Sequence, residues 1–211
     1  MAPEGRKILS IISSVAVILV LIGVIFSNSV FFIIGAISVV SLFFCIIFFR
    51  DPMRNIPEGK NIIVAPADGK ITAIKSINDP EIGGDAQLIS VFLNIFNVHV
   101  NRVPINGEVI NVNHKNGNFI SAYKHSAADV NEQTNIIFNT AVGVLKVRQI
   151  AGLIARRILC YARAGLTMKQ GDRLGFILFG SRTDIILPPS VSVLVSKGQR
   201  VFGNETIIGK F

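Results

Sequence analysis

The stretch "GFILFGSRTDIILP", residues 175–188, indicates what kind of fold the C-terminal part of the chain can form. Its two apolar runs, rich in Ile, Leu and Phe, are typical of buried strands. Gly180-Ser181-Arg182 separates them, and this is not one of the usual two-residue hairpin turns, such as Asn-Gly or Asp-Gly. The stretch therefore predicts two strands and leaves the purpose of a Gly-Ser break between them to be explained.

The same pattern of short strands, punctuated by Gly and Pro, continues through the chain after residue 60. Residues 61–74 hold a β-branched run, a turn at Pro66–Gly69 and a second alternating run. Residues 86–114 add two or three strands, with a hairpin signal at Asn106-Gly107. Residues 153–163 have helical spacing, although a strand is possible in their first half. Without long strand–helix alternation, the pattern predicts a mainly β domain, a sandwich or barrel-like fold with minor helix.

Two long apolar segments precede this domain. Residues 8–27 and 30–49 contain no charged side chain, and each is long enough to cross a hydrocarbon core as a helix. We expect a membrane hairpin at 1–50, a linker at 51–59 and the β domain at 60–211. A cleaved signal peptide and a buried soluble hairpin are the alternatives, although two full-length spans without a clear cleavage site argue against a signal peptide.

Cations flank the start of the first apolar segment and the end of the second, but not the turn between them. Arg6 and Lys7 precede the first, Arg50 and Arg54 follow the second, and the short turn carries none. The positive-inside rule then predicts an inner-membrane protein with its N-terminus and its β domain in the cytoplasm. The two cysteines, one in a span and one in the domain, suit a reducing compartment.

Positive charge is concentrated between residues 141 and 182, where the net charge is +7 out of +8 for the whole chain. For a domain tethered to a bilayer, this predicts contact with anionic lipid headgroups. Nucleic acid is a poor partner because aromatic residues are sparse in this stretch and the chain is anchored. An ordinary solvated basic face is the simpler alternative.

Common catalytic motifs are missing around Ser181 and the histidines. Phe179 and Thr183 flank Ser181 where a G-x-S-x-G elbow needs glycines. His99, His114 and His125 have no metal-binding spacing, so no metal is expected. A strained Gly-Ser bond offers another chemistry, in which the hydroxyl attacks the preceding carbonyl, the ester eliminates and a pyruvoyl group forms. Most Gly-Ser dipeptides are simple turns, so this reading needs support from the rest of the sequence.

Five blocks in order supply that support. They are "APADGKI" (65–71), "FLNIFNVHVNRVPINGEV" (92–109), "NEQT" (131–134), "VRQIAGLIARRI" (147–158) and "GDRLGFILFGSRTDIILP" (171–188). Together they closely resemble the phosphatidylserine decarboxylase family in its short bacterial and archaeal form, over roughly residues 55–211. The resemblance implies self-cleavage between Gly180 and Ser181, giving a β chain that ends at Gly180 and an α chain that begins with a pyruvoyl group. That group would form a Schiff base with phosphatidylserine, release CO₂ and leave phosphatidylethanolamine.

The resemblance also assigns residues. Asp68 matches an acidic residue implicated in self-processing, although Asp is also favoured in turns. His99 matches a family histidine suited to proton transfer, although a histidine in a strand is more often structural. Arg102 stands where longer family members carry a second histidine, so either His99 serves both steps or Arg102 acts electrostatically. In the electrostatic role, Arg102 would hold the carboxylate or phosphate of the substrate. Arg148, Arg156 and Arg157 are further candidates for phosphate contacts, with ordinary solvated surface as the alternative.

Two other classes of function stay open at this point. The C-terminal segment, residues 193–211, resembles a biotinyl or lipoyl carrier domain, but Met168-Lys169 lacks the symmetric setting of a carrier lysine. A membrane-anchored interaction module that no longer matures is the other alternative. For the decarboxylase reading, assembly into a homo-oligomer also stays open.

Overall fold

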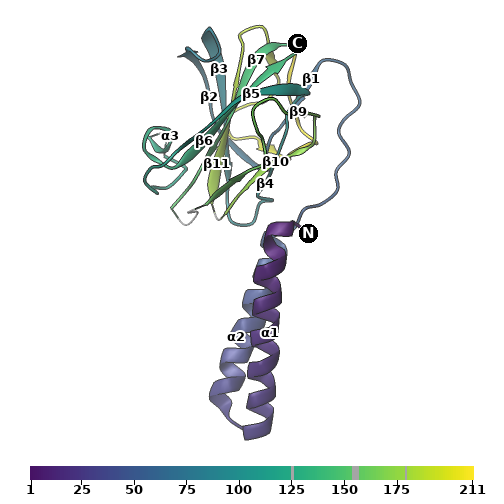
Figure 1. The fold of residues 1–211 in the computed structure, drawn as a ribbon, viewed down its shortest axis with the longest axis vertical. Helices are drawn as coiled ribbons and strands as arrows, with labels where there is room; N and C mark the ends of the chain where they lie inside the picture. The colour runs from purple at the N-terminus through teal and green to yellow at the C-terminus, as the bar shows by residue number, and fades with distance from the viewer. Residues whose placement is uncertain (125, 154–156, 179) are drawn as a thin grey trace. The chain divides into compact units, whose positions relative to one another are not determined.

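The computed structural model describes residues 1–124, 126–153, 157–178 and 180–211. Over these residues the chain divides into two compact units, Met1–Met53 and Arg54–Phe211. The first unit is a pair of helices, α1 (Pro3–Phe26) and α2 (Ser29–Phe48), and the second contains the strands (Figure 1). Arg54 thus belongs to the compact β unit, ahead of the expected start of that domain at residue 60.

The helical pair is closed at both ends by hydrogen bonds. At its turn, Ser27 adopts a left-handed conformation (φ 47°) and the Asn28 side chain caps α2 by accepting from Val30 N at 3.0 Å. At its other end, Ala2 N donates to Phe49 O at 2.7 Å. Several buried residues of the pair are small, which lets the helix backbones approach closely, as in membrane helix pairs: Gly5, Ala16, Gly23 and Gly35.

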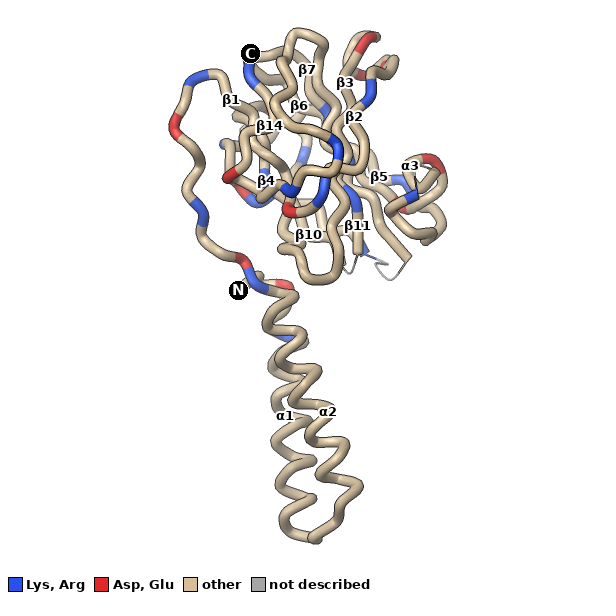
Figure 2. The backbone as a smooth tube through the Cα atoms, turned by 180° about the vertical axis from the view of Figure 1, so that it is seen from behind, with Lys and Arg blue, Asp and Glu red and all other residues tan. Residues whose placement is uncertain are grey.

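Both helices are long and apolar enough to cross a membrane, judged by length and composition. In Figure 2 their tubes carry charged residues only near the end where the chain starts and the linker leaves. Charge is thus confined to one end of the pair, which is the arrangement that the sequence predicts for a membrane hairpin.

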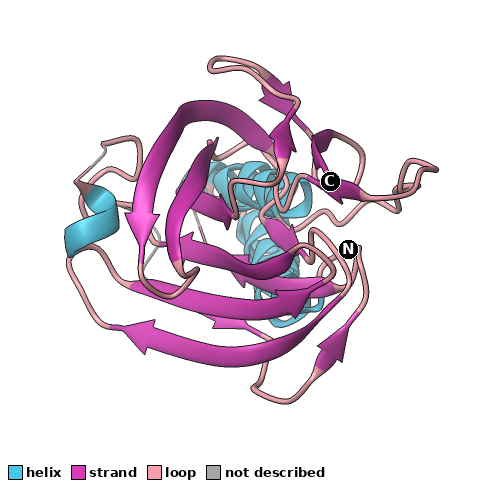
Figure 3. Cartoon of the chain, turned by 90° about the horizontal axis from the view of Figure 1, so that it is seen from above, coloured by secondary structure: helices cyan, strands magenta, loops and turns pink. Residues whose placement is uncertain are grey.

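The second unit is built around one long antiparallel sheet that curls on itself, as Figure 3 shows from above. In the described part of the chain its strands follow the order β13 (Arg200–Val201), β2 (Gly69–Asp79), β3 (Gly84–Leu93), β11 (Ser181–Leu187), β7 (Gly143–Ile150), β6 (Gln133–Thr140), β5 (Gly107–Lys115) and β9 (Thr167–Met168). Curling brings one face of the sheet inward, where it can be filled with apolar side chains.

Two small sheets and one short helix complete the unit where the chain is described. One small sheet has the order β1 (Ile62–Val64), β14 (Ile207–Lys210), β12 (Ser192–Val193), and the other has the order β4 (Val100–Arg102), β10 (Arg173–Ile177), β8 (Ile158–Cys160). The short helix is α3 (Ala127–Val130). The predicted fold class, mainly β with a curled, barrel-like sheet and minor helix, is confirmed.

Strand β11 lies near the middle of the long sheet, and all seven of its residues are buried. Ile185 and Leu187 belong to the main apolar core, together with residues of β3, β7 and β14. Because successive side chains of a strand alternate, Ser181 and Thr183 lie on this same inner face, whereas Arg182 and Asp184 lie on the opposite one. Burial on both faces explains the near-continuous apolar run that follows residue 184.

Two local expectations were wrong. Asn106-Gly107 does not join neighbouring strands, because β5 pairs with β6 and β9, while β4 pairs with β10. The helix suggested for residues 153–163 is replaced, where the chain is described, by strand β8. Tertiary pairing with β10 outweighs the weak helical spacing there.

The pairing of β11 predicts that a cut between Gly180 and Ser181 leaves the two fragments associated. Residues 181–211 would stay attached through β11 to β3 and β7, through β13 to β2, and through β14 to β1. We expect two fragments in denaturing electrophoresis and one particle containing both in native mass spectrometry from detergent. Loss of the small fragment during native size-exclusion chromatography would contradict this expectation.

Candidate active site

Gly180 precedes β11 in a left-handed conformation, with φ of +66°. A Cβ added here would meet no atom within 4 Å, so it is the backbone conformation and not lack of space that favours glycine. A glycine also leaves its own carbonyl unhindered. The residue before Ser181 is therefore held in a conformation that most other residues would adopt only with strain.

The carbonyl of Gly180 lies against a second glycine. A Cβ built on Gly152 would stand 1.8 Å from Gly180 O and 2.9 Å from Gly180 C. Any side chain at position 152 would therefore displace the carbonyl of the Gly180–Ser181 bond. Gly152 was quoted within a sequence block but not singled out, because only the folded chain shows what approaches it.

Ser181 is the first residue of β11 and lies opposite Leu93 of β3. Its side chain is fully buried, and its Oγ has no hydrogen-bond partner among the described residues. Buried hydroxyls nearly always have a partner, since leaving one without a bond costs free energy. An orphaned hydroxyl beside a left-handed glycine is thus the least satisfied polar group at this end of β11.

His99 lies on the other side of Gly180, in the connection between β3 and β4, and is fully buried. Its Nδ1 is 2.9 Å from Asn97 O, and because a carbonyl can only accept, Nδ1 carries the proton. Nε2 is then the nitrogen with the lone pair, and it accepts from Gly180 N at 3.3 Å. The ring is fixed in the tautomer whose basic nitrogen faces the Gly180 backbone.

A buried network of polar side chains lies next to His99 and Ser181. Asn101 Oδ1 accepts from Gln149 Nε2 at 3.1 Å and from Thr183 Oγ1 at 2.9 Å, joining β4, β7 and β11. The Asn101 side chain also donates to His99 O at 3.4 Å. The sequence analysis did not single out these three residues. A usable signal was present in Gln149, which interrupts the apolar alternation Leu145, Val147 at an inward-facing position.

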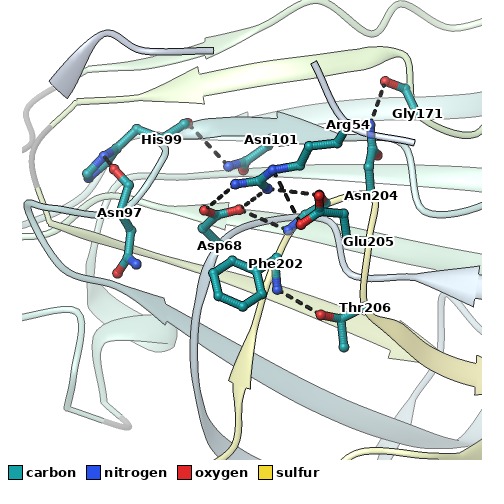
Figure 4. A network of polar contacts seen from close by, with 11 residues as sticks. Arg54, Asp68, Asn97, His99, Asn101, Gly171, Phe202, Asn204, Glu205 and Thr206 are labelled. Carbon is teal, nitrogen blue, oxygen red and sulfur yellow. Dashed lines mark hydrogen bonds and ion pairs between the residues drawn. The ribbon is translucent and has the colours of Figure 1, made fainter. Parts of the chain in front are cut away.

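Asp68, in the connection between β1 and β2, is bound to Arg54 (Figure 4). The Asp68 carboxylate accepts hydrogen bonds from both terminal nitrogens of the Arg54 guanidinium, Nη1 to Oδ1 and Nη2 to Oδ2, the latter at 2.8 Å. It also accepts from Gly203 N at 2.9 Å. Arg54 further donates to Gly203 O at 2.9 Å and lies over the Phe202 ring. In the described part of the chain Asp68 shares no hydrogen bond or ion pair with His99.

The three predicted arginines that the structure describes do not share a partner or a site. Arg102 donates to Gly171 O at 3.1 Å, and Arg148 donates to Asn135 at 2.8 Å. Since Gln149 faces the core, the neighbouring Arg148 lies on the face of the sheet opposite Ser181. Arg157 is exposed, and its carbonyl accepts from Leu178 N at 3.3 Å, shortly before the Gly180–Ser181 bond. Arg156 lies outside the described residues.

The remaining candidates lie elsewhere. His114 lies on β5, and its Nδ1 is 3.0 Å from Thr134 Oγ1 on β6. His125 lies outside the described residues. Among the described residues no group of three or more His, Cys, Asp or Glu side chains could hold a metal ion. Burial raises the pKa of the Cys160 thiol, which makes it a poor nucleophile. Lys169, exposed after β9, donates its backbone N–H to Asp172 at 2.8 Å.

Comparison with known proteins decides the family. A family model described as phosphatidylserine decarboxylase matches residues 42–209. The chain therefore belongs to the phosphatidylserine decarboxylase family. Relatives named phosphatidylserine decarboxylase proenzyme include those of Chlorobaculum parvum (44% identical, 80% of this chain and 78% of the relative) and Rickettsia africae (46%, 84% and 79%). The relative from Citrifermentans bemidjiense is 39% identical over 99% of this chain and 95% of its own length.

Membership confirms the resemblance of the five blocks. It agrees with a chain that is made as a precursor, because each of these relatives is called a proenzyme. The carrier-domain and interaction-module alternatives gain nothing from these comparisons. The roles of Ser181, Gly180, His99 and Asp68 are not fixed by a family match and stay predictions.

Gly152→Ala is expected to slow cleavage of the precursor about tenfold or more, because the new methyl would displace the Gly180 carbonyl. The measurement is a time course of fragment appearance after synthesis, followed by denaturing electrophoresis. Gly59→Ala is the matched control, since its Cβ would meet only the Ile62 side chain, at 3.2 Å. Normal cleavage in Gly152→Ala would show that the close approach has no bearing on processing.

Arg54→Ala is expected to lower the free energy of unfolding by about 3–5 kcal/mol, since it leaves the buried Asp68 carboxylate without its cation. Denaturant unfolding of the full chain in detergent measures this loss. Arg200→Ala, at an exposed position, is the control and should change little. A double variant, Arg54→Ala with Asp68→Ala, should be more stable than Arg54→Ala alone, and the reverse order would contradict the pairing.

Proposed function

We propose that the chain is a self-processing phosphatidylserine decarboxylase, which converts phosphatidylserine to phosphatidylethanolamine and CO₂. One observation carries the proposal: the buried, orphaned hydroxyl of Ser181 follows a left-handed Gly180 whose N–H meets the basic nitrogen of His99. The family match supplies the substrate class, since the similar proenzymes are named for phosphatidylserine. This arrangement favours chemistry at the Gly180–Ser181 bond over a simple turn.

Self-cleavage uses only groups that the chain holds. Ser181 Oγ adds to the Gly180 carbonyl carbon, the C–N bond breaks, and the hydroxyl proton ends on the released Ser181 amine, which leaves an ester. Loss of the Ser181 α-proton then breaks the Cβ–O bond and frees Gly180 as a carboxylate. The dehydroalanine left at position 181 takes up water and loses ammonia, which gives a pyruvoyl group at the start of the small fragment.

His99 is the residue that we assign to proton transfer in this sequence. Its Nδ1–H is held by Asn97 O, which fixes the ring, and Nε2, which accepts from Gly180 N, is the nitrogen that takes up a proton when that contact is released. Asn101 restrains the same segment through the His99 carbonyl. Asp68 is assigned a supporting role, since its bond to Gly203 N and its ion pair with Arg54 join the start of β2, the linker and the segment after β13.

The residues around Ser181 fit a small covalent group. The Ser181 oxygen, which leaves with Gly180 as part of its carboxylate, has no hydrogen-bond partner among the described residues, so its departure breaks no side-chain hydrogen bond there. A pyruvoyl group there would supply a carbonyl that binds the substrate amine and accepts electrons as CO₂ leaves. Gly152 and His99 would hold its surroundings, and His99 would supply a proton to the product.

Substrate binding and location are inferred more coarsely. Of the predicted arginines in the described part of the chain, Arg157 is linked to the segment before Gly180, because its carbonyl accepts from Leu178 N, whereas the Arg102 side chain donates to Gly171 O. We assign Arg157 to the phosphate or carboxylate of the substrate. The apolar helices α1 and α2 would hold the enzyme in the membrane that contains its lipid substrate, with the β domain on the cytoplasmic side.

The covalent event gives a direct test. Denaturing mass spectrometry of the purified chain is expected to show a fragment of residues 181–211 that begins with pyruvate and has no free α-amine. Ser181→Ala should stay intact, because the attacking hydroxyl is gone, while the buried-serine control Ser90→Ala should cleave normally. In His99→Ala the precursor should accumulate, because its cleavage should be at least about a hundredfold slower than in the parent chain, as expected when a general base is lost.

The same measurement separates the alternatives. An intact chain that decarboxylates phosphatidylserine would contradict the pyruvoyl mechanism. A modified lysine with an unbroken backbone would instead indicate a carrier domain, and an intact chain with no activity would indicate an interaction module.

A further inference from the structure

Three large apolar side chains are exposed in the loops that surround the candidate active site. Phe96 is 64% exposed, Tyr123 is 63% exposed and Leu153 is 64% exposed. We call these three residues the apolar rim. A single exposed apolar residue is common on a protein surface, but several gathered around one site are a sign of an interaction surface.

Each member of the apolar rim is tied to the candidate site by a described contact. Phe96 precedes Asn97, whose carbonyl holds His99, and the loop is closed by hydrogen bonds of 2.9 Å from Phe96 N to Asn94 Oδ1 and from Asn94 N to Asn97 Oδ1. Leu153 follows Gly152, which lies against the Gly180 carbonyl. Figure 1 shows the β3–β4 connection at the same end of the domain as the start of β11.

Tyr123 is placed by two contacts. Its ring packs edge-on against Phe92 at 5.3 Å between centroids, and Phe92 lies opposite Arg182 in the sheet. The next residue, Lys124, has its carbonyl held by Arg182 Nη1 at 3.1 Å. Ala122, just before Tyr123, is 3.5 Å from the position of a Cβ on Gly152. The three loops therefore surround the Gly180–Ser181 bond.

The charges of these loops are of one sign. Lys124 and Arg157 are exposed beside the apolar rim, and residues 94–98, 119–124 and 152–157 contain no Asp or Glu. Aromatic and aliphatic tips with flanking cations and no acids are the combination that favours the headgroup region of an anionic bilayer. Binding of a protein partner would not require the three loop segments to lack Asp and Glu.

We propose that the apolar rim inserts into the lipid surface, so that the headgroup of a bilayer lipid reaches Ser181 between Phe96, Tyr123 and Leu153. The inference rests on the proposed function, because a lipid substrate must reach a fully buried residue without leaving the bilayer. Lys124 and Arg157 attract the anionic headgroup, and the apolar tips hold the loops at the interface.

The chain contains no tryptophan, so a single substitution creates a unique fluorescent probe. Full-length Phe96→Trp and Leu153→Trp variants are reconstituted in vesicles of phosphatidylserine and phosphatidylcholine brominated near the upper part of the acyl chains. We expect quenching and a blue shift relative to unbrominated vesicles. Leu194→Trp is the control, because Leu194 is 50% exposed but bonds to Ile208 in the sheet of β1, β14 and β12, and it should not be quenched.

Absence of quenching at Phe96→Trp and Leu153→Trp, or equal quenching at Leu194→Trp, would overturn the proposal. Emission that instead changes as the protein is diluted among more vesicles would assign the apolar rim to contact between copies of the chain. Because fluorescence does not depend on turnover, these outcomes stand whether or not the chain decarboxylates phosphatidylserine.

A second readout uses activity. The double variant Phe96→Ser with Leu153→Ser should still cleave at Gly180–Ser181 and should still act on a short-chain phosphatidylserine dissolved as monomers. Its rate on bilayer phosphatidylserine should fall by roughly tenfold per side chain removed. An equal loss on both substrates would refute membrane insertion, whereas an inactive parent enzyme with intact quenching would refute only the proposed function.

Discussion

The position of β11 between β3 and β7 is the constraint on which the rest of the β unit depends. A central strand needs partners on both edges, so β10, the preceding strand, cannot continue into the same sheet and pairs instead with β4 and β8. The chain must change sheets between Ile177 and Ser181. Left-handed Gly180 stands at that change, so the unusual backbone follows from topology before any chemistry is considered.

Burial on both faces gives β11 two separate sets of polar contacts. On its outer face, Arg182 pairs with Asp184 at 2.8 Å and holds the Lys124 carbonyl, which ties down the loop that carries Tyr123. On its inner face, Thr183 joins the Asn101 network that supports His99, while Ser181 is left without a described partner. Thr183 and Asn101 are thus hydrogen-bonded, whereas the Ser181 hydroxyl beside Gly180 and Gln149 Oε1 have no hydrogen-bond partner among the described residues.

The local sequence pattern predicted the fold class and the two strands on either side of the Gly-Ser break, but not the contacts across the sheet. Strand alternation placed β10 and β11 correctly, because it depends on neighbours in sequence. Arg54 could not be paired with Asp68 from the sequence, since nothing local links a linker cation to a turn. Arg148 was expected beside the substrate, yet one position along β7 decides which face a side chain occupies, and Gln149 takes the inner one.

The net charge of residues 141–182 overstates the positive charge that this stretch presents at the protein surface. Lys146 is buried between Asp79 and Glu81, and Arg182 is buried against Asp184, so two of its cations are neutralised by acids. Charges further than about 8–10 Å from the headgroup are screened at physiological salt. In the proposed contact with an anionic lipid, we therefore assign the attraction to Lys124 and Arg157, which are the exposed cations beside the site among the described residues, and not to the summed charge of the stretch. Because Lys124 and Arg157 belong to the loops around Ser181, the proposed attraction of the headgroup acts at those loops.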